Sequence, residues 1–386
     1  MKLSERVKKI QPSATLEVIT KVAKMKEKGE SVISFGAGEP DFDTPEFIKL
    51  AAKSAIDKGY THYTPTGGIS ELKKAICTKF KKDNNIDYLP EEIVVSNGAK
   101  HSLCNAIEAL INPGDEVLVA SPFWVSYSEM ITLAGGVPVF VDTFFEDGYV
   151  MRAEEIEKKI TKNTKVIIIN SPGNPTGAVL DKEELIKIGN LAIKYDIAII
   201  SDEIYEKLIY GKKHISIASL SDEFKKRTIT VNGVSKAYAM TGWRIGYLAA
   251  PREIVKGILD LQGHMTSNPN SIAQYATKAA LEMDESIIEN MRIEFEKRRD
   301  YMYQELSKIK GFKMPPKPEG AFYIFLDISE FKMKSVEFAN YALEKAHVAL
   351  VPGIAFGMDN CVRLSYANSM EDIIEGINRL KSIALN

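Results

Sequence analysis

The chain has 386 residues, and its 50 lysines and arginines against 52 acidic residues give a formal net charge of −2. This length exceeds what one compact core usually holds, so we expect two domains. The charge balance leaves no basic field for a nucleic acid, and no apolar run approaches the roughly 20 residues that span a bilayer. The N-terminus lacks the apolar core of a secretion signal, and the three cysteines form neither a metal pattern nor a disulfide framework. We therefore expect a cytoplasmic protein without a metal site.

Short apolar runs alternate with amphipathic stretches along most of the chain. A charged opening over residues 3–28 and a strand at 32–35 precede two helices, at 45–57 and 69–82. The strand runs that follow lie at 93–96, 116–120, 137–141, 165–170, 197–201 and 228–232. Continuous Val and Ile strands that alternate with helices indicate a mostly parallel α/β sheet with helices on both faces. We expect the chemistry of such a sheet at the carboxyl ends of its strands.

The pattern changes after residue 282. A long charged helix at 284–309 is followed by apolar strand runs at 320–326, 348–353 and 361–366, separated by helical stretches. These elements predict a smaller α+β domain that the N-terminal segment joins. We place the large domain at residues 46–284 and the small domain at residues 1–45 and 285–386.

The segment Ser235–Tyr247 combines a lysine and an arginine in a setting of small residues. The amine of Lys236 can form a Schiff base with an aldehyde, and the guanidinium of Arg244 can grip a phosphate. Pyridoxal 5′-phosphate (PLP) carries both groups on one ring. Gly242 and Gly246 allow the close backbone approach that such a ligand needs. The segment closely resembles the PLP-lysine signature of class I aminotransferases, the fold type I PLP enzymes related to aspartate aminotransferase.

The resemblance extends to motifs that follow other predicted strands. It implies that Asp202, in Asp-Glu-Ile-Tyr, pairs with the pyridine nitrogen of PLP. Tyr205 of the same motif and Asn174, in Asn-Pro-Thr-Gly, would share the 3-oxygen of the cofactor. Trp124 matches the aromatic residue that stacks on the ring. The implied catalytic residues are Lys236, Asp202 and Tyr205.

The same family implies a set of phosphate ligands. The amides of Gly98 and Ala99 precede a predicted helix, where backbone N–H groups bind phosphate without side-chain charge. Arg244 and the hydroxyl of Ser235 would complete the set within one subunit. Tyr63 fits the slot of a tyrosine that reaches the cofactor phosphate of the neighbouring subunit. The resemblance therefore implies a homodimer whose active sites are shared across the interface.

For the substrate, the resemblance assigns Arg363 to the α-carboxylate as a fork-to-fork pair. The backbone of Gly38 would lie near that carboxylate. In aspartate- and prephenate-type members a lysine at the place of Lys100 meets the distal carboxylate, and Thr15 matches a segment that closes over it. The implied substrate contacts are Gly38, Trp124, Asn174, Arg363, Lys100 and Thr15.

The reaction we expect is transamination between an acidic amino acid, with aspartate first, and 2-oxoglutarate by double displacement. An aminotransferase of broader aromatic, alanine or prephenate specificity and a PLP-dependent C–S lyase share most of these motifs and stay open. A PLP-sensing transcription regulator would need an additional DNA-binding region before the catalytic fold. A binding module without turnover would not need Asp202 and Lys236 together.

Overall fold

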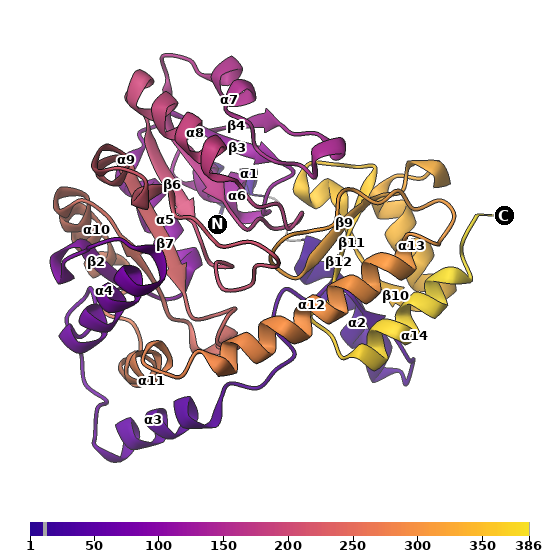
Figure 1. Ribbon diagram of the computed structural model, residues 1–386, viewed down its shortest axis with the longest axis horizontal. Helices are drawn as coiled ribbons and strands as arrows, with labels where there is room; N and C mark the ends of the chain where they lie inside the picture. Colours follow the sequence, from indigo (N-terminus) through magenta and orange to yellow (C-terminus); the bar gives the residue numbers. More distant parts are fainter. Residues whose placement is uncertain (11–13, 386) are drawn as a thin grey trace.

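The computed structural model describes residues 1–10 and 14–385 and contains a large sheet and a smaller one, with a long helix running between the two regions (Figure 1). The large sheet has the strand order β2-β8-β7-β6-β5-β3-β4. Its strands are β2 (Ile93–Ser96), β3 (Glu116–Ser121), β4 (Val137–Asp142), β5 (Thr164–Asn170), β6 (Ala198–Asp202), β7 (Thr228–Gly233) and β8 (Gly246–Ala249). Strand β8 runs antiparallel to β2 and β7, and the other neighbours pair in parallel. The predicted mostly parallel sheet is confirmed.

Helices cover both faces of this sheet because alternate residues of each strand point to opposite sides. Ile168 and Ile200 pack in one core with α5, α6 and α10, whereas Ile167 and Ile199 pack in another with α7, α8 and α9. These helices are α5 (Ala99–Leu110), α6 (Ser126–Leu133), α7 (Ala153–Lys159), α8 (Lys182–Tyr195), α9 (Asp222–Arg227) and α10 (Arg252–Met265). A third core beside β2 and β8 involves α3 (Glu46–Asp57), α4 (Ser70–Asn84) and α11 (Ser271–Leu281).

The smaller region is built from both ends of the chain. Its antiparallel sheet has the order β11-β12-β9. A parallel pair, β1 with β10, lies beside it. The elements of this region are α2 (Ala14–Glu27), β1 (Ile33–Ser34), α12 (Ser286–Leu306), β9 (Tyr323–Asp327), α13 (Ser335–Ala346), β10 (Val348–Ala349), β11 (Val351–Pro352), β12 (Cys361–Ser365) and α14 (Met370–Lys381). The pairing of β1 with β10 is how the N-terminal segment joins this region. The exact boundaries at 45/46 and 284/285 stay a prediction.

One expectation for this region is wrong. The run 348–353 was expected to form a single strand, but it forms β10 and β11, which belong to different sheets. Val348–Ala349 pairs with β1, and Val351–Pro352 pairs with β12, so the chain crosses from one sheet to the other at Leu350. The apolar run is continuous because both short strands are buried.

Shorter elements complete the described part of the chain. Helix α1 (Glu5–Lys9) contacts α6. Single 3₁₀ turns occur at η1 (Pro90–Glu92), η2 (Phe145–Asp147), η3 (Ile217–Ser219), η4 (Thr241–Trp243), η5 (Ser329–Phe331) and η6 (Gly353–Phe356). The peptide bonds before Pro122, Pro172 and Pro175 are cis, and the three cysteines are free. Among the described helices, none has the length and apolar character needed to cross a membrane.

Candidate active site

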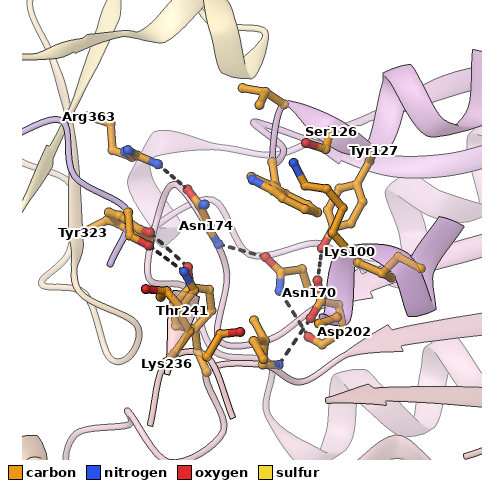
Figure 2. A pocket seen from close by; sticks show the side chains of 18 of the residues that line it. Lys100, Ser126, Tyr127, Asn170, Asn174, Asp202, Lys236, Thr241, Tyr323 and Arg363 are labelled. Carbon is orange, nitrogen blue, oxygen red and sulfur yellow. Dashed lines mark hydrogen bonds between the residues drawn. The ribbon is translucent and has the colours of Figure 1, made fainter. Parts of the chain in front are cut away.

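A cavity of about 380 Å³ lies at the carboxyl ends of the parallel strands, where side chains of the large and small sheets meet (Figure 2). A cavity of this size suits a small organic ligand. It is lined by Gly38, Ala99, Lys100, Leu103, Trp124, Val125, Ser126, Tyr127, Asn170, Asn174, Asp202, Ile204, Tyr205, Ser235, Lys236, Thr241, Arg244, Tyr323 and Arg363. The structure thus brings most of the predicted site residues together. Gly98 and Tyr63 are not in this lining.

Lys236 presents its amine to this cavity just after β7 ends. Its Nζ donates a hydrogen bond to the carbonyl of Gly38 at 2.5 Å. Burial lowers the pKa of Lys236 to about 8. The charge of Glu39 raises this pKa, whereas the charges of Arg363 and Arg244 lower it further. A fraction of the amine is therefore unprotonated near neutral pH, which is the form that attacks an aldehyde.

Asp202 is the last residue of β6, and its carboxylate is held from two sides. Tyr127 of α6 donates its hydroxyl to Oδ2 at 2.7 Å, and the amide of Ile204 donates to Oδ1 at 3.2 Å. Burial raises the pKa of Asp202 to about 6, although the hydrogen bond from Tyr127 lowers it. The site therefore offers an oriented, buried carboxylate that is ionised at neutral pH.

A chain of hydrogen bonds links Asp202 to the small sheet, as Figure 2 shows. The side chain of Asn170 donates to the carbonyl of Asp202 at 3.1 Å and accepts from the amide of Asn174 at 2.9 Å. The side-chain oxygen of Asn174 accepts from Arg363 at 3.1 Å. Asn174 is therefore fixed between the two sheets, and its amide nitrogen is left to face the cavity.

Arg363 is a buried cation, only 2% exposed. Its guanidinium donates to the carbonyl of Gly36 at 2.9 Å and lies 4.3 Å from the ring centre of Tyr323. Its Nε finds no hydrogen-bond partner within residues 1–10 and 14–385, and none of the ion pairs there involves it. Burial lowers the pKa of Arg363. Because a buried charge without a counter-ion is costly, this position favours an anionic ligand.

Tyr205 and Tyr323 meet at the floor of the cavity. Their hydroxyl oxygens are 3.0 Å apart, and burial raises the pKa of both. Tyr323 therefore contacts both Tyr205 and Arg363, which joins the hydroxyl of a residue that follows β6 to the buried cation of the small sheet.

Arg244 and the start of α5 form a second anion-binding corner. The Arg244 guanidinium donates to the backbone carbonyls of Thr241 at 2.8 Å and Asn97 at 3.4 Å, and it remains exposed. The amide of Gly98 donates to the carbonyl of Ser96 at 2.8 Å within the turn before α5, and its role as a phosphate ligand stays a prediction. A Cβ at Gly98 would lie 2.5 Å from Arg244, so the glycine makes room for the arginine. Ala99 is the first residue of α5, and the unpaired first-turn amides of this helix begin there.

Ser235, which directly precedes the catalytic candidate Lys236, is buried and lines the same cavity. On the opposite wall, the ammonium of Lys100 lies 4.9 Å from the ring centre of Trp124, which packs edge-on against Tyr127. Burial lowers the pKa of Lys100, and the charge of Arg244 adds to the effect. This ammonium is a further cation beside the cavity.

Sequence reasoning missed three polar residues of this site: Tyr127, Asn170 and Tyr323. Asn170 could have been found, because it ends a predicted strand at the edge where the chemistry was expected. Tyr127 follows Trp124 by one helical turn, which is a weaker signal. Tyr323 gave no sequence signal, because it lies inside an apolar strand run.

Comparisons with known proteins agree with this geometry. A family model described as aminotransferase class I and II matches residues 30–380. The chain belongs to this family. It is 48% identical to the aspartate aminotransferase of Bacillus sp. (strain YM-2), over 98% of both chains, and 50% identical to a probable aspartate/prephenate aminotransferase of Aquifex aeolicus, again over 98% of both. The solved structure of an aspartate aminotransferase from Thermus thermophilus with maleate superimposes with a TM-score of 0.96 at 42% identity, covering 99% of this chain and 100% of that one.

Two predicted residues of this aminotransferase lie away from the cavity or outside the described side chains. Tyr63 is 90% exposed on the loop between α3 and α4. Contact with a second subunit requires an exposed side chain, and its reach to the partner's phosphate stays a prediction. The side chain of Thr15 lies outside the described part of the chain, so its role stays a prediction.

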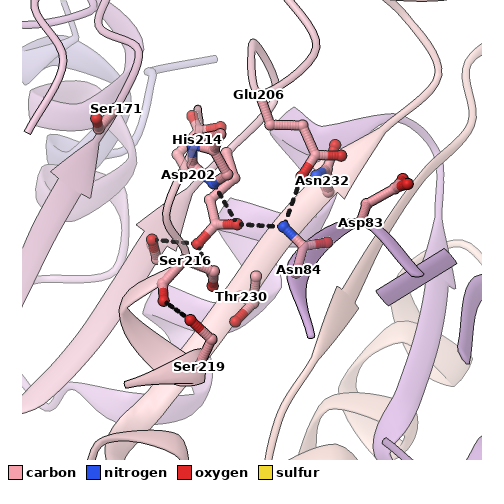
Figure 3. Close-up of polar contacts among 12 residues, drawn as sticks. Asp83, Asn84, Ser171, Asp202, Glu206, His214, Ser216, Ser219, Thr230 and Asn232 are labelled. Carbon is pink, nitrogen blue, oxygen red and sulfur yellow. Dashed lines mark hydrogen bonds and ion pairs between the residues drawn. The ribbon is translucent and has the colours of Figure 1, made fainter. Parts of the chain in front are cut away.

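Behind Asp202, the aminotransferase contains a buried ionic cluster (Figure 3). Glu203 accepts hydrogen bonds from Ser201 at 2.9 Å, Ser216 at 2.7 Å and His214 at 2.9 Å. Burial opposes protonation of His214, but the Glu203 carboxylate outweighs it and raises the pKa of His214. The cluster fixes the backbone next to Asp202.

A second carboxylate completes the cluster. Glu206 forms an ion pair with Lys79 of α4 and accepts a hydrogen bond from Asn84 at 2.7 Å. One oxygen or nitrogen each from Glu203, Glu206 and His214 lie within 4.8 Å of one another, which is close enough for a metal ion. Lys79 already supplies the cation beside these carboxylates. The cluster is therefore balanced by its own side chains.

We expect Lys79→Met to destabilise the fold by about 3 to 5 kcal/mol, because it leaves the buried carboxylate of Glu206 without its cation. Burial raises the pKa of Glu206, but Lys79 and its other neighbours outweigh this and lower it from 4.5 to about 2. The stabilisation is thus complete above the ordinary glutamate pKa and is lost as the pH falls toward the folded value. Urea unfolding at several pH values measures both effects.

The matched control is Lys81→Met on the same helix, which breaks an exposed pair with Asp87. We expect it to cost no more than about 1 kcal/mol. Equal losses for the two variants would contradict the importance of the buried pair.

Proposed function

We propose that this aminotransferase uses PLP to exchange an amino group between aspartate, or another acidic amino acid, and 2-oxoglutarate by double displacement. The observation that carries the proposal is the set of charges around one cavity. An amine and a buried carboxylate, Lys236 and Asp202, face it together with cations that have no acidic partner among the described residues. Those cations are Arg363, Arg244 and Lys100.

The residues fit PLP by their chemistry. Lys236 supplies a partly unprotonated amine for the aldehyde, and Asp202 supplies an anion for the ring nitrogen. Asn174 and Tyr205 are within the same lining and would hold the 3-oxygen. Arg244, the amide of Ala99 and the hydroxyl of Ser235 would hold the phosphate, since a helix N-terminus and a guanidinium both favour it.

When bound, PLP supplies an electron-poor ring that stabilises negative charge at the substrate Cα. Asp202 would keep the ring nitrogen protonated, because a buried anion beside that nitrogen favours its charged form. Lys236 would take the proton from Cα and deliver it to the carbon that carried the aldehyde, which requires an amine that gains and loses a proton near neutral pH. Trp124 would stack on the ring, and Tyr205 and Asn174 would orient it through its 3-oxygen. Tyr127 holds the carboxylate of Asp202 in place.

Two cations of the cavity lining, Arg363 and Lys100, indicate the substrate class. Arg363 would bind the α-carboxylate in a bidentate pair, which replaces the counter-ion it lacks. Lys100 would bind a distal carboxylate. The Thermus structure carries maleate, a four-carbon dicarboxylate, and the Bacillus relative is an aspartate aminotransferase, which supports the same choice.

A second candidate substrate is prephenate, which also carries two carboxylates. The Aquifex relative is described as a probable aspartate/prephenate aminotransferase. A substrate panel of aspartate, glutamate, alanine, aromatic amino acids, prephenate and the thioether cystathionine, scored for glutamate, pyruvate and ammonia, separates these activities. Release of pyruvate and ammonia without amino transfer would instead indicate a C–S lyase.

Lys100→Ala tests the substrate assignment. Loss of a charge-assisted hydrogen bond should lower kcat/KM for aspartate by about ten- to a hundredfold, corresponding to about 1.5 to 3 kcal/mol. Alanine and aromatic substrates have no distal carboxylate, so their kcat/KM should hardly change. An equal loss for all substrates would make Lys100 a cofactor or folding residue.

We also place the protein in the cytoplasm as a homodimer with shared sites. The three free cysteines suit a reducing compartment. Tyr63, exposed on its own subunit, would reach the cofactor phosphate of the other one.

Mixing two inactive variants, Tyr63→Ala and Lys236→Ala, tests the shared site. A mixed dimer contains one site with both defects and one site with neither, so exchange of subunits should restore activity at one site per mixed dimer. Activity is measured after subunit exchange, and mass spectrometry confirms that mixed dimers formed. Mixed dimers without activity would refute the shared site.

A further inference from the structure

Gln262 of α10 is a fully buried amide whose bonds reach three separate elements. Its Oε1 accepts from the hydroxyl of Ser96 at 2.8 Å and from the side chain of Asn105 at 2.9 Å. Its Nε2 donates to the carbonyls of Val95 at 2.9 Å and Thr66 at 2.8 Å. Both ends of the amide are satisfied, so this side chain has one well-defined position.

These bonds join two loops that face different phosphates under the proposed function. Ser96 ends β2, directly before the turn through Gly98 into α5, where the phosphate of the same subunit would bind. Thr66 lies three residues after Tyr63, in the loop that would serve the partner subunit. The side chain of Gln262 therefore contacts the end of β2 beside the phosphate position of its own subunit. It also contacts the Tyr63 loop, which would complete the site of the partner subunit.

A second buried glutamine fixes the same loop. Gln274 accepts from the amide of Ile69 at 2.8 Å and donates to the hydroxyl of Thr64 at 3.0 Å. At Gly68, where φ is +99°, a Cβ would lie 2.5 Å from the side chain of Val95, so the loop sits directly on β2. The loop is thus rigid on its inner side, while Tyr63 projects outward.

We propose that Gln262 is a positioning residue for the cofactor phosphate at both sites of the dimer. It acts on its own site through Ser96 and Val95, and on the partner's site through Thr66 and the Tyr63 loop. The inference rests on the proposed function, because it requires a phosphate at α5 and at Tyr63. A methionine in its place would leave the carbonyls of Val95 and Thr66 buried without a donor, so the loop would move to satisfy them.

The test compares PLP with pyridoxal, which has the same aldehyde and ring but no phosphate. Cofactor-free full-length protein is titrated with each ligand, for wild type, Gln262→Met and Gln262→Glu. We expect both variants to raise the Kd for PLP by about tenfold or more while the Kd for pyridoxal stays unchanged. Gln304→Met, on the exposed face of α12, is the matched control and should change neither value.

The glutamate variant keeps the size of the side chain and its acceptor, so it tests the loss of the donor if the methionine variant does not fold. An equal rise in both Kd values would show a purely structural role and overturn the inference. A wild-type protein that does not prefer PLP over pyridoxal would overturn the proposed phosphate site, and with it the inference.

Mixed dimers separate the effect of Gln262 on its own site from its effect on the partner's site. In a dimer of Gln262→Met/Lys236→Ala with wild type, only the wild-type subunit retains cofactor after borohydride reduction. Its own Gln262 is intact, and its Tyr63 contact comes from the altered partner. We expect this dimer to need more PLP for half-maximal labelling than a dimer of Lys236→Ala with wild type. Equal requirements would show that Gln262 acts within one subunit only, and the proposal for the second site would be wrong.

Discussion

Lys236→Ala should abolish transamination, lowering kcat by a factor of about 10⁴ or more, because one change removes both the nucleophile and the proton carrier. The amine has the properties that this double role needs. It lies in the cavity beside the carbonyl of Gly38, and burial holds its pKa at about 8. Steady-state assay of glutamate formation from aspartate and 2-oxoglutarate measures the loss.

Lys213→Ala, at an exposed position, is the control and should retain full activity. The wild-type holoenzyme should be yellow and bleach on borohydride treatment, with the label on Lys236 in peptide mapping. A label on a different lysine would contradict the assignment. Residual activity in Lys236→Ala near the wild-type level would do the same.

The parts of the site that sequence alone could predict lie at strand ends. Asp202 ends one buried strand and Lys236 closely follows another. A parallel sheet brings the carboxyl ends of its strands to one edge, so their proximity follows from the strand pattern. The mostly parallel sheet was predictable for the same reason, since β5, β6 and β7 are rich in β-branched residues.

What could not be predicted depends on packing between distant segments. Tyr127 reaches Asp202 across 75 residues, and Tyr205 meets Tyr323 across 118. No local pattern gives either pairing, because Tyr127 and Tyr323 have the sequence context of ordinary core aromatic residues. Lys79 likewise reads as a solvated helix lysine until α4 packs against the segment after β6.

The glycine at position 98 shows a constraint of another kind. A glycine before a helix suggests an open N–H group, but the amide of Gly98 donates to Ser96 within the turn. The reason for glycine there is the approach of Arg244, which a Cβ would block. That constraint comes from a residue far along the chain, so only the structure reveals it.

Asp202→Ala should keep part of its cofactor yet lower kcat by about 10² to 10³-fold, the usual cost of removing one preorganised charge at a reacting centre. Without the carboxylate, nothing among the described residues of this wall supplies an anion to the ring nitrogen. The ring would lose its proton near neutral pH and with it most of its capacity to stabilise charge at Cα. Binding depends more on Lys236 and Arg244, so it should be weakened less.

Asp202→Asn distinguishes charge from shape. The asparagine fills the same space and can still accept from Tyr127, whose hydroxyl now donates to Oδ2 at 2.7 Å. It carries no negative charge, so we expect a loss close to that of Asp202→Ala. The measurement is kcat per bound cofactor, with cofactor content determined from absorbance after release by alkali. If the asparagine variant turns over like the wild type, the carboxylate orients the ring only by its shape and Asp202 does not act by its charge.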